Sequence, residues 1–143
     1  MPKNDYWKLS ACESAKLIKD GSISAEDLIS SCIERVNQTN NEINAIVDDL
    51  SASALEKACE LDKLTKKGKF KGPLHGVPIT IKENIDQKGY ATPNGLEALK
   101  NLIAPGNAPV VDNLEKDGAI VIGRTNTPEF SMRGTTDNLI HGR

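Results

Sequence analysis

One stretch organises this chain, a turn-rich lead into a short apolar strand: Gly72-Pro73-Leu74-His75-Gly76-Val77-Pro78-Ile79-Thr80-Ile81-Lys82-Glu83-Asn84. Aliphatic residues alternate with other residues from position 77 to position 82, which is the period of a β-strand. The alternation predicts a strand over residues 77–82 that ends at Lys82. Ligand crevices in open α/β sheets form outside such carboxyl ends, so Lys82 is the first candidate for a functional residue. The alternative is a solvated lysine that only ends the strand.

The composition is that of a soluble globular protein, with 27% charged and 38% hydrophobic residues in 143. A net charge of −2 gives no electrostatic argument for binding nucleic acid or an anionic membrane. No run approaches the roughly 18 apolar residues of a membrane span. The first five residues lack the apolar stretch of a signal peptide. We expect a cytoplasmic protein made of one domain.

The cysteines and histidines give no sign of a metal or cofactor site. The three cysteines are odd in number and widely spaced, which indicates neither a disulfide framework nor a zinc site. His75 and His141 are the only histidines, and neither has the spacing of metal ligands. We predict no metal and no cofactor, and we interpret His75 as a residue that orients a loop.

Helical periodicity and capping residues predict three helices before the central strand, over residues 10–20, 24–37 and 51–66. A capping box at Ser10 and Glu13 starts the first helix. Ser51 or Ser53 should cap the third. A short strand is expected over residues 43–48.

The region after Lys82 predicts a parallel βαβ unit. A turn-rich passage over residues 89–95 should overhang the end of the strand. A short helix with Val110 and Val111 buried then ends at Gly118, and residues 119–123 are apolar enough for a strand buried on both faces. Thr127-Pro128-Glu129 predicts the start of a further helix. The fold class is therefore α/β, with helices packed on a mixed sheet.

Two motifs in this second half, residues 72–84 and residues 118–130, resemble the amidase signature family in sequence and spacing. The resemblance is close over residues 72–142 and loose over residues 1–71. It implies that residues 1–143 are the incomplete amino-terminal part of a single larger amidase-like domain, helical over 1–71, with the lysine-bearing strand and the βαβ-like region over 72–143. The strand at 119–123 should then have lost a neighbour and form an open sheet edge.

The resemblance also implies a chemistry, the hydrolysis of carbon–nitrogen amide bonds by a Ser–cis-Ser–Lys triad in which Lys82 matches the lysine. A base must remove the proton of the attacking serine, and a lysine can do so where burial lowers its pKa. The Gly/Ser-rich signature that carries the family's serines has no match here. Ser10 is interpreted as a helix cap and Ser131 as a residue after a first helical turn, so neither should replace them. We expect the 143-residue chain alone to be inactive.

Asn126 and Glu129 are weaker candidates for substrate contact, because the resemblance places both near the strand end. For Glu129 the alternative is a first-turn carboxylate that complements a helix dipole. The expected substrate is a small-molecule amide.

Two other functions stay open at this point. The same triad serves the A subunit of a glutamine-dependent tRNA amidotransferase, which would require partner subunits. The chain could also be a non-catalytic binding or scaffold fragment derived from an amidase.

Overall fold

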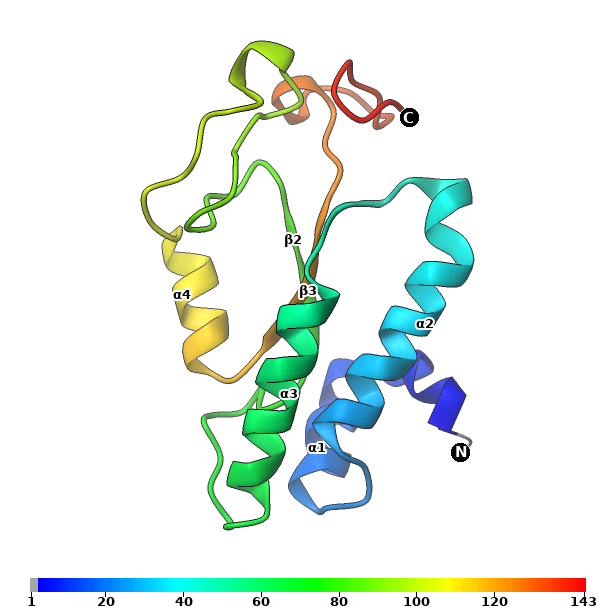
Figure 1. Ribbon diagram of the computed structural model, residues 1–143, viewed down its shortest axis with the longest axis vertical. Helices are drawn as coiled ribbons and strands as arrows, with labels where there is room; N and C mark the ends of the chain where they lie inside the picture. The colour runs from blue at the N-terminus through cyan, green and yellow to red at the C-terminus, as the bar shows by residue number, and fades with distance from the viewer. Residues whose placement is uncertain (1–2) are drawn as a thin grey trace.

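The computed structural model describes the backbone of residues 3–143 and the side chains of residues 5–143. The expectation that the first five residues lack the apolar stretch of a signal peptide therefore concerns residues that lie partly outside this range. The main elements in chain order are α1 (Ala11–Lys19), α2 (Ala25–Ile43), β1 (Ile46–Asp49), α3 (Ser51–Thr65), β2 (Pro78–Lys82), α4 (Pro109–Lys116) and β3 (Ile120–Thr125). Short 3-10 turns lie at Lys3–Lys8, Glu97–Leu99 and Glu129–Ser131. The predicted α/β class is confirmed (Figure 1).

The three strands form one mixed sheet in the order β1-β3-β2. β2 runs parallel to β3, and β1 runs antiparallel to it. Because α4 lies in the connection from β2 to β3, these elements form the predicted βαβ unit. The expectation that residues 119–123 form a sheet edge is wrong: β3 is the central strand, and in the described part of the chain the unpaired sides belong to β1 and β2.

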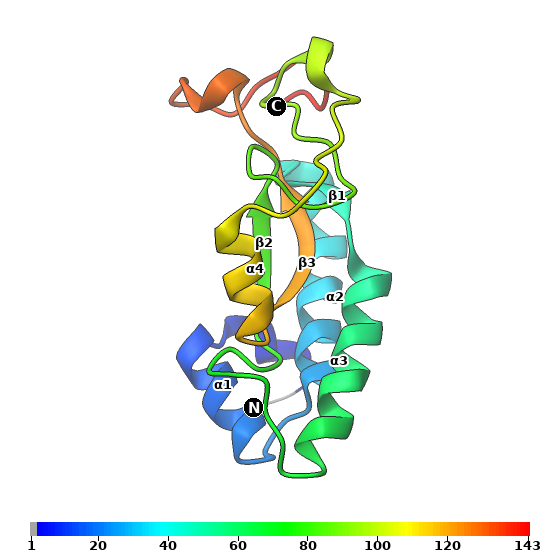
Figure 2. The ribbon, with the colours of Figure 1, turned by 90° about the vertical axis from the view of Figure 1, so that its left-hand side faces the viewer.

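The central strand is buried on both faces, as predicted. Successive side chains of a strand point to opposite faces, so β3 contributes to two separate cores. Ile120 and Ile122 lie in the larger core with α1, α2 and α3. Val121 packs with Ile81 of β2 and Val111 of α4 in the smaller one. Figure 2 shows α2 and α3 on one side of the strands and α4 on the other.

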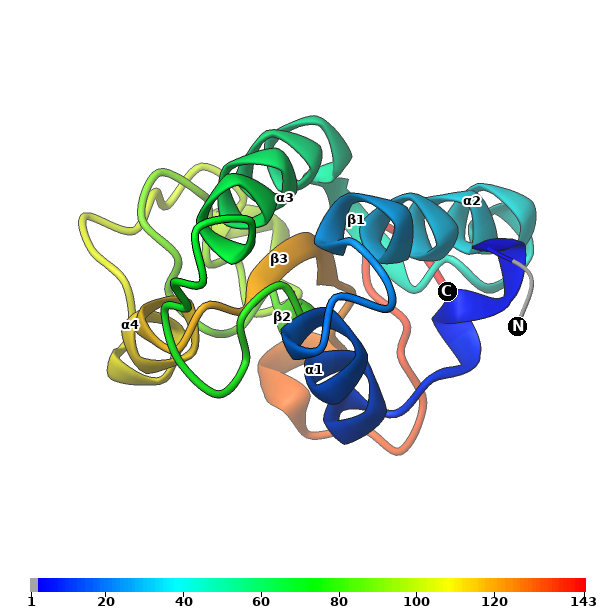
Figure 3. The same cartoon turned by 90° about the horizontal axis from the view of Figure 1, so that it is seen from below.

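Two helices of the larger core, α1 and α2, begin where their capping residues predict. Ser10 Oγ accepts a hydrogen bond from the Glu13 backbone N–H at 3.3 Å, and Glu13 Oε2 accepts one from the Ser10 N–H at 2.8 Å, which completes the capping box of α1. Ser24 caps α2. Figure 3 shows α2 and α3 next to each other. No helix in the described residues is long and apolar enough to cross a membrane.

Two predicted boundaries in this half are wrong. α2 continues past residue 37 to Ile43 and ends at Asn44 in a left-handed conformation with φ 47°. The Asn40 side chain holds both the N–H and the carbonyl of Ile46 at 2.8 Å, so the strand begins at Ile46 and not at residue 43. Neither predicted serine caps α3, because the N-cap position belongs to Leu50 and both serines lie inside the helix.

Two further predictions fail after β2. Val110 is 48% exposed, and only Val111 of the predicted pair is buried. No regular helix follows Thr127, because Phe130 and Ser131 take positive φ values of 50° and 58°. The Phe130 N–H donates to Asn94 O at 2.8 Å, which holds this turn under the overhanging loop that the sequence predicted.

His75 orients the loop before β2, in agreement with the interpretation of the sequence. Its Nδ1 accepts from the Lys71 N–H at 3.0 Å, so Nε2 is the nitrogen that carries hydrogen toward Leu61 O and Thr65 Oγ1. Burial lowers the pKa of His75, which keeps the ring neutral. A Cβ at Gly118, where φ is 93°, would lie 2.8 Å from His75 Cα, so this approach requires glycine.

Candidate active site

The carboxyl ends of β2 and β3 meet at one end of the sheet because the two strands are parallel. Lys82 ends β2 and pairs in register with Thr125, which ends β3. The loop that leaves β2 and the segment that follows β3 both gather over this end (Figure 1). The predicted position of Lys82 at a strand end is confirmed.

The side chain of Lys82 is half-buried and points to the turn after β3. Its Nζ donates to Ser131 Oγ at 3.0 Å. Ser131 Oγ also accepts from Asn84 Nδ2 at 3.0 Å and lies 3.1 Å from Thr127 Oγ1. The prediction that Ser131 follows a first helical turn is wrong, since Phe130 and Ser131 form a left-handed turn that brings the Ser131 hydroxyl to the lysine. An amine within reach of hydroxyls is the arrangement that proton transfer between the two requires.

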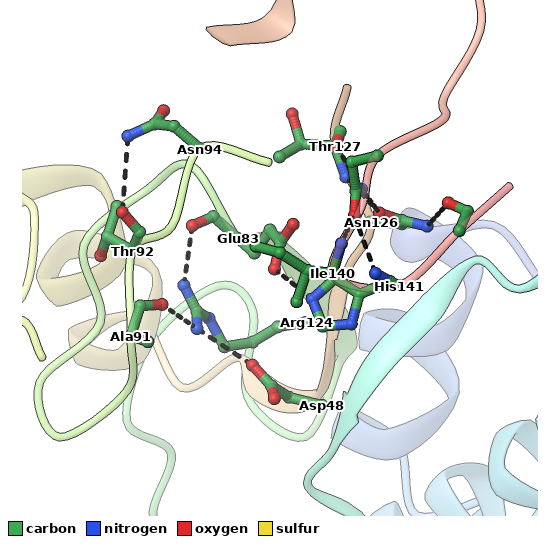
Figure 4. Close-up of polar contacts among 12 residues, drawn as sticks. Asp48, Glu83, Ala91, Thr92, Asn94, Arg124, Asn126, Thr127, Ile140 and His141 are labelled. Atoms are coloured by element: carbon green, nitrogen blue, oxygen red, sulfur yellow. Dashed lines mark hydrogen bonds and ion pairs between the residues drawn. The ribbon is translucent and has the colours of Figure 1, made fainter. Parts of the chain in front are cut away.

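The Arg124 side chain connects β3 to the elements around the site. It is fully buried on β3, and its guanidinium reaches across to the loop that follows β2. One nitrogen donates to Asp48 Oδ2 at 3.0 Å and to Ala91 O at 2.6 Å, and the other donates to Glu83 O at 3.1 Å (Figure 4). A buried charge requires such partners, so these contacts tie the loop and β1 to the central strand.

A buried carboxylate lies directly after Lys82. Glu83 is 1% exposed, and its Oε2 lies 2.9 Å from His141 Nε2 in the segment after β3 (Figure 4). Burial raises the pKa of Glu83, and the contact with His141 opposes this shift. The pair joins the end of β2 to the last residues of the chain.

The two weaker candidates have different surroundings. Asn126 is buried, and its side-chain amide makes four hydrogen bonds, with Asn44 O, Thr127 N, Asn138 Nδ2 and Gly142 O. Glu129 is half-buried, and its Oε2 lies 3.3 Å from an Arg133 nitrogen. Substrate contact by either residue stays a prediction.

Three residues of the site were not predicted from the sequence. Arg124 had a visible signal, since a charged residue directly after a wholly apolar strand has to find buried partners. Ser131 and His141 had none, because their contacts depend on a turn and a chain path that local sequence does not encode. Within residues 5–143, no group of three or more His, Cys, Asp or Glu side chains could hold a metal ion.

Comparison with known proteins gives consistent matches. A family model described as Amidase matches residues 27–143. The chain is 52% identical over 141 residues to the indoleacetamide hydrolase of Bradyrhizobium diazoefficiens, covering 99% of this chain and 27% of that protein. It is 38% identical over 134 residues to the A subunit of the glutamyl-tRNA(Gln) amidotransferase of Dehalococcoides mccartyi, covering 94% of this chain and 27% of that protein.

Solved structures are also similar. Fatty acid amide hydrolase matches with a TM-score of 0.94 and 30% identity, over 99% of this chain and 25% of that chain. The chain therefore spans about a quarter of the length of these proteins.

Proposed function

Because the chain belongs to the amidase family, we propose that it supplies the lysine base of an amide hydrolase, and that Lys82 is this base. The observation that carries the proposal is the position of the Lys82 amine. It lies at the carboxyl ends of two parallel strands, 3.0 Å from a serine hydroxyl. Arg124 and the Glu83–His141 pair hold the backbone segments around the amine, so its position for proton transfer is fixed.

The mechanism that we propose is that of the Ser–cis-Ser–Lys triad. Lys82 takes the proton of the attacking serine through the second serine, and the serine oxygen adds to the amide carbonyl. The carbon–nitrogen bond then breaks as the proton passes from Lys82 to the leaving amine, and water releases the acyl group from the serine. The family's two serines have no match in residues 1–143, so this chain contributes the base without the nucleophile.

The substrate class follows from the relative that shares 52% identity, which is named for indoleacetamide. We propose a small amide and take indoleacetamide as the first compound to test. The experiment compares the 143-residue chain with a chimera in which residues 1–143 replace the matching part of the Bradyrhizobium protein. Ammonia release is the readout.

We expect release by the chimera and none by the 143-residue chain, since loss of a serine nucleophile costs on the order of a millionfold in rate. Release by the chain alone would show that the missing-nucleophile argument is wrong. An inactive but folded chimera, beside an active Bradyrhizobium protein, would count against amide hydrolysis as the function.

A second function has its own support in the 38% identity to the A subunit of an amidotransferase. Such a protein would require partner subunits and would release ammonia from glutamine. Purification of the native protein distinguishes the two: bound partner subunits with glutamine-dependent ammonia release favour the amidotransferase, and indoleacetamide hydrolysis without partners favours the amidase.

A further inference from the structure

We infer that Ser131 is a positioning residue for Lys82, whose hydroxyl fixes the lysine amine at the strand end. Among the described side chains, Ser131 Oγ is the one hydrogen-bond acceptor that Lys82 Nζ contacts. The inference deepens the proposed function, because it names what holds the proposed base. The contact itself is tested without any catalytic readout.

The hydrogen bonds around Ser131 fix the direction of its hydroxyl. The Lys82 ammonium and the Asn84 amide nitrogen can only donate, so together they occupy both lone pairs of Ser131 Oγ. The Ser131 hydrogen then points to Thr127 Oγ1 at 3.1 Å. Thr127 in turn donates to Pro128 O at 3.2 Å. These hydrogen bonds together orient the Ser131 hydroxyl so that one of its lone pairs faces Lys82 Nζ.

The backbone of the turn is strained in a way that serves this contact. Phe130 and Ser131 are consecutive non-glycine residues in the left-handed region, which is uncommon and costs free energy. The turn is held by the hydrogen bonds from the Phe130 N–H to Asn94 O and from the Ser131 N–H to Pro128 O. Glycine at position 131 would adopt the same backbone without strain. What serine adds at this position is the hydroxyl that contacts Lys82.

The test uses the 143-residue chain with 15N-labelled lysine and follows proton exchange between the side-chain ammonium groups and water by NMR. Ser131→Gly removes the hydroxyl and relaxes the turn. The matched control is Met132→Ala, which shortens an 85% exposed neighbour in the same turn. Lys57, whose Nζ lies 2.8 Å from Glu115 Oε1, is the internal reference.

We expect the Lys82 protons to exchange more slowly than those of lysines without a partner. In Ser131→Gly their exchange should rise about fivefold, as expected for the loss of one hydrogen bond. Exchange at Lys57 should stay unchanged, and Met132→Ala should leave Lys82 unchanged.

Three results would overturn the inference: no slowing at Lys82 in the unsubstituted chain, no rise in Ser131→Gly, or an equal rise in Met132→Ala. In the chimera, Ser131→Gly should lower kcat and leave KM unchanged. If the chimera proves inactive while the exchange results hold, the proposed function fails and the positioning of Lys82 by Ser131 stands. If the chimera is active and the exchange effect is missing, the positioning of Lys82 by Ser131 fails and the proposed function stands.

Discussion

The larger core and the strand end of this molecule are built in different ways. The larger core joins α1, α2 and α3 to one face of β3 through apolar side chains, several of them fully buried. The strand end, where β2 and β3 stop, is held by directed hydrogen bonds around Arg124, Asn126 and Ser131. Large apolar side chains stay exposed there, namely Leu102, Ile103, Phe130, Met132 and Leu139.

This difference determines which amino-acid substitutions each region tolerates. In the larger core the free energy depends on filled volume, so a similar apolar residue should serve nearly as well. At the strand end it depends on where donors and acceptors point, and a lost partner leaves a buried group unsatisfied.

Arg124→Met should cost about 4 kcal/mol in the free energy of unfolding, because it removes the donors of four hydrogen bonds, to Asp48, Ala91, Glu83 and Ile85. The side chain is fully buried, and a methionine fills its space without replacing any hydrogen bond. Urea denaturation measures the change. Asp48→Asn is the control: Asp48 is partly exposed, and an amide can still accept from the guanidinium, so its cost should stay below about 1 kcal/mol. A smaller loss for Arg124→Met than for Asp48→Asn would contradict the account of the strand end.

Ile29→Ala should cost about 3 kcal/mol, since Ile29 is fully buried in the larger core and its truncation leaves a cavity. Ile29→Leu, which conserves volume, should cost less than about 1.5 kcal/mol. Ile43→Ala at the exposed end of α2 gives the baseline and should stay within about 0.5 kcal/mol. Equal effects of the Leu and Ala substitutions at position 29 would contradict the claim that the stability of the larger core depends on filled volume.

The same contrast explains what the sequence could and could not predict. The helices and strands themselves follow local rules: apolar periodicity and the Ser10–Glu13 capping box predicted α1, and alternation predicted β2 and its terminal Lys82. The strand end depends on partners far apart in the chain, such as Arg124 with Ala91 and Glu83 with His141. Periodicity carries no information about such pairs. Thr127-Pro128-Glu129 had every local sign of a helix, and the contact of Phe130 with Asn94 overrode them.

The Glu83–His141 pair makes the strand end sensitive to pH. Burial raises the pKa of Glu83, so the folded state holds this proton more tightly than the unfolded state. The contribution of Glu83 to stability should therefore fall as pH rises from the ordinary glutamate range to its raised folded pKa. Because contact with His141 lowers the Glu83 pKa, His141→Phe should raise it further.

Carboxyl 13C NMR across the acidic and neutral range measures this titration. Glu13 is the internal reference, since its hydrogen bonds with Ser10 lower its pKa. A Glu83 that titrates with Glu13, or one that does not respond to His141→Phe, would contradict the placement of a buried carboxylate at this site.

Leu139→Ser should have the smallest effect, within about 0.5 kcal/mol, because the side chain is 81% exposed. Thermal unfolding measures the effect. Leu28→Ser makes the same substitution at a buried position of α2, so the two variants compare an exposed and a buried leucine. A large loss for Leu139→Ser would mean that the exposed apolar side chains at the strand end already pack against something in solution.

The role of Lys82 as the base of an amide hydrolase is tested by the kcat/KM of the chimera for indoleacetamide, with Lys82→Ala beside the unsubstituted protein. Lys82→Arg is the matched control, because it keeps the positive charge but cannot accept a proton at neutral pH. We predict that both variants lose activity by about a thousandfold or more, as expected for the removal of a general base. Full activity in Lys82→Ala, or activity restored by Lys82→Arg, would contradict the role of Lys82 as the base.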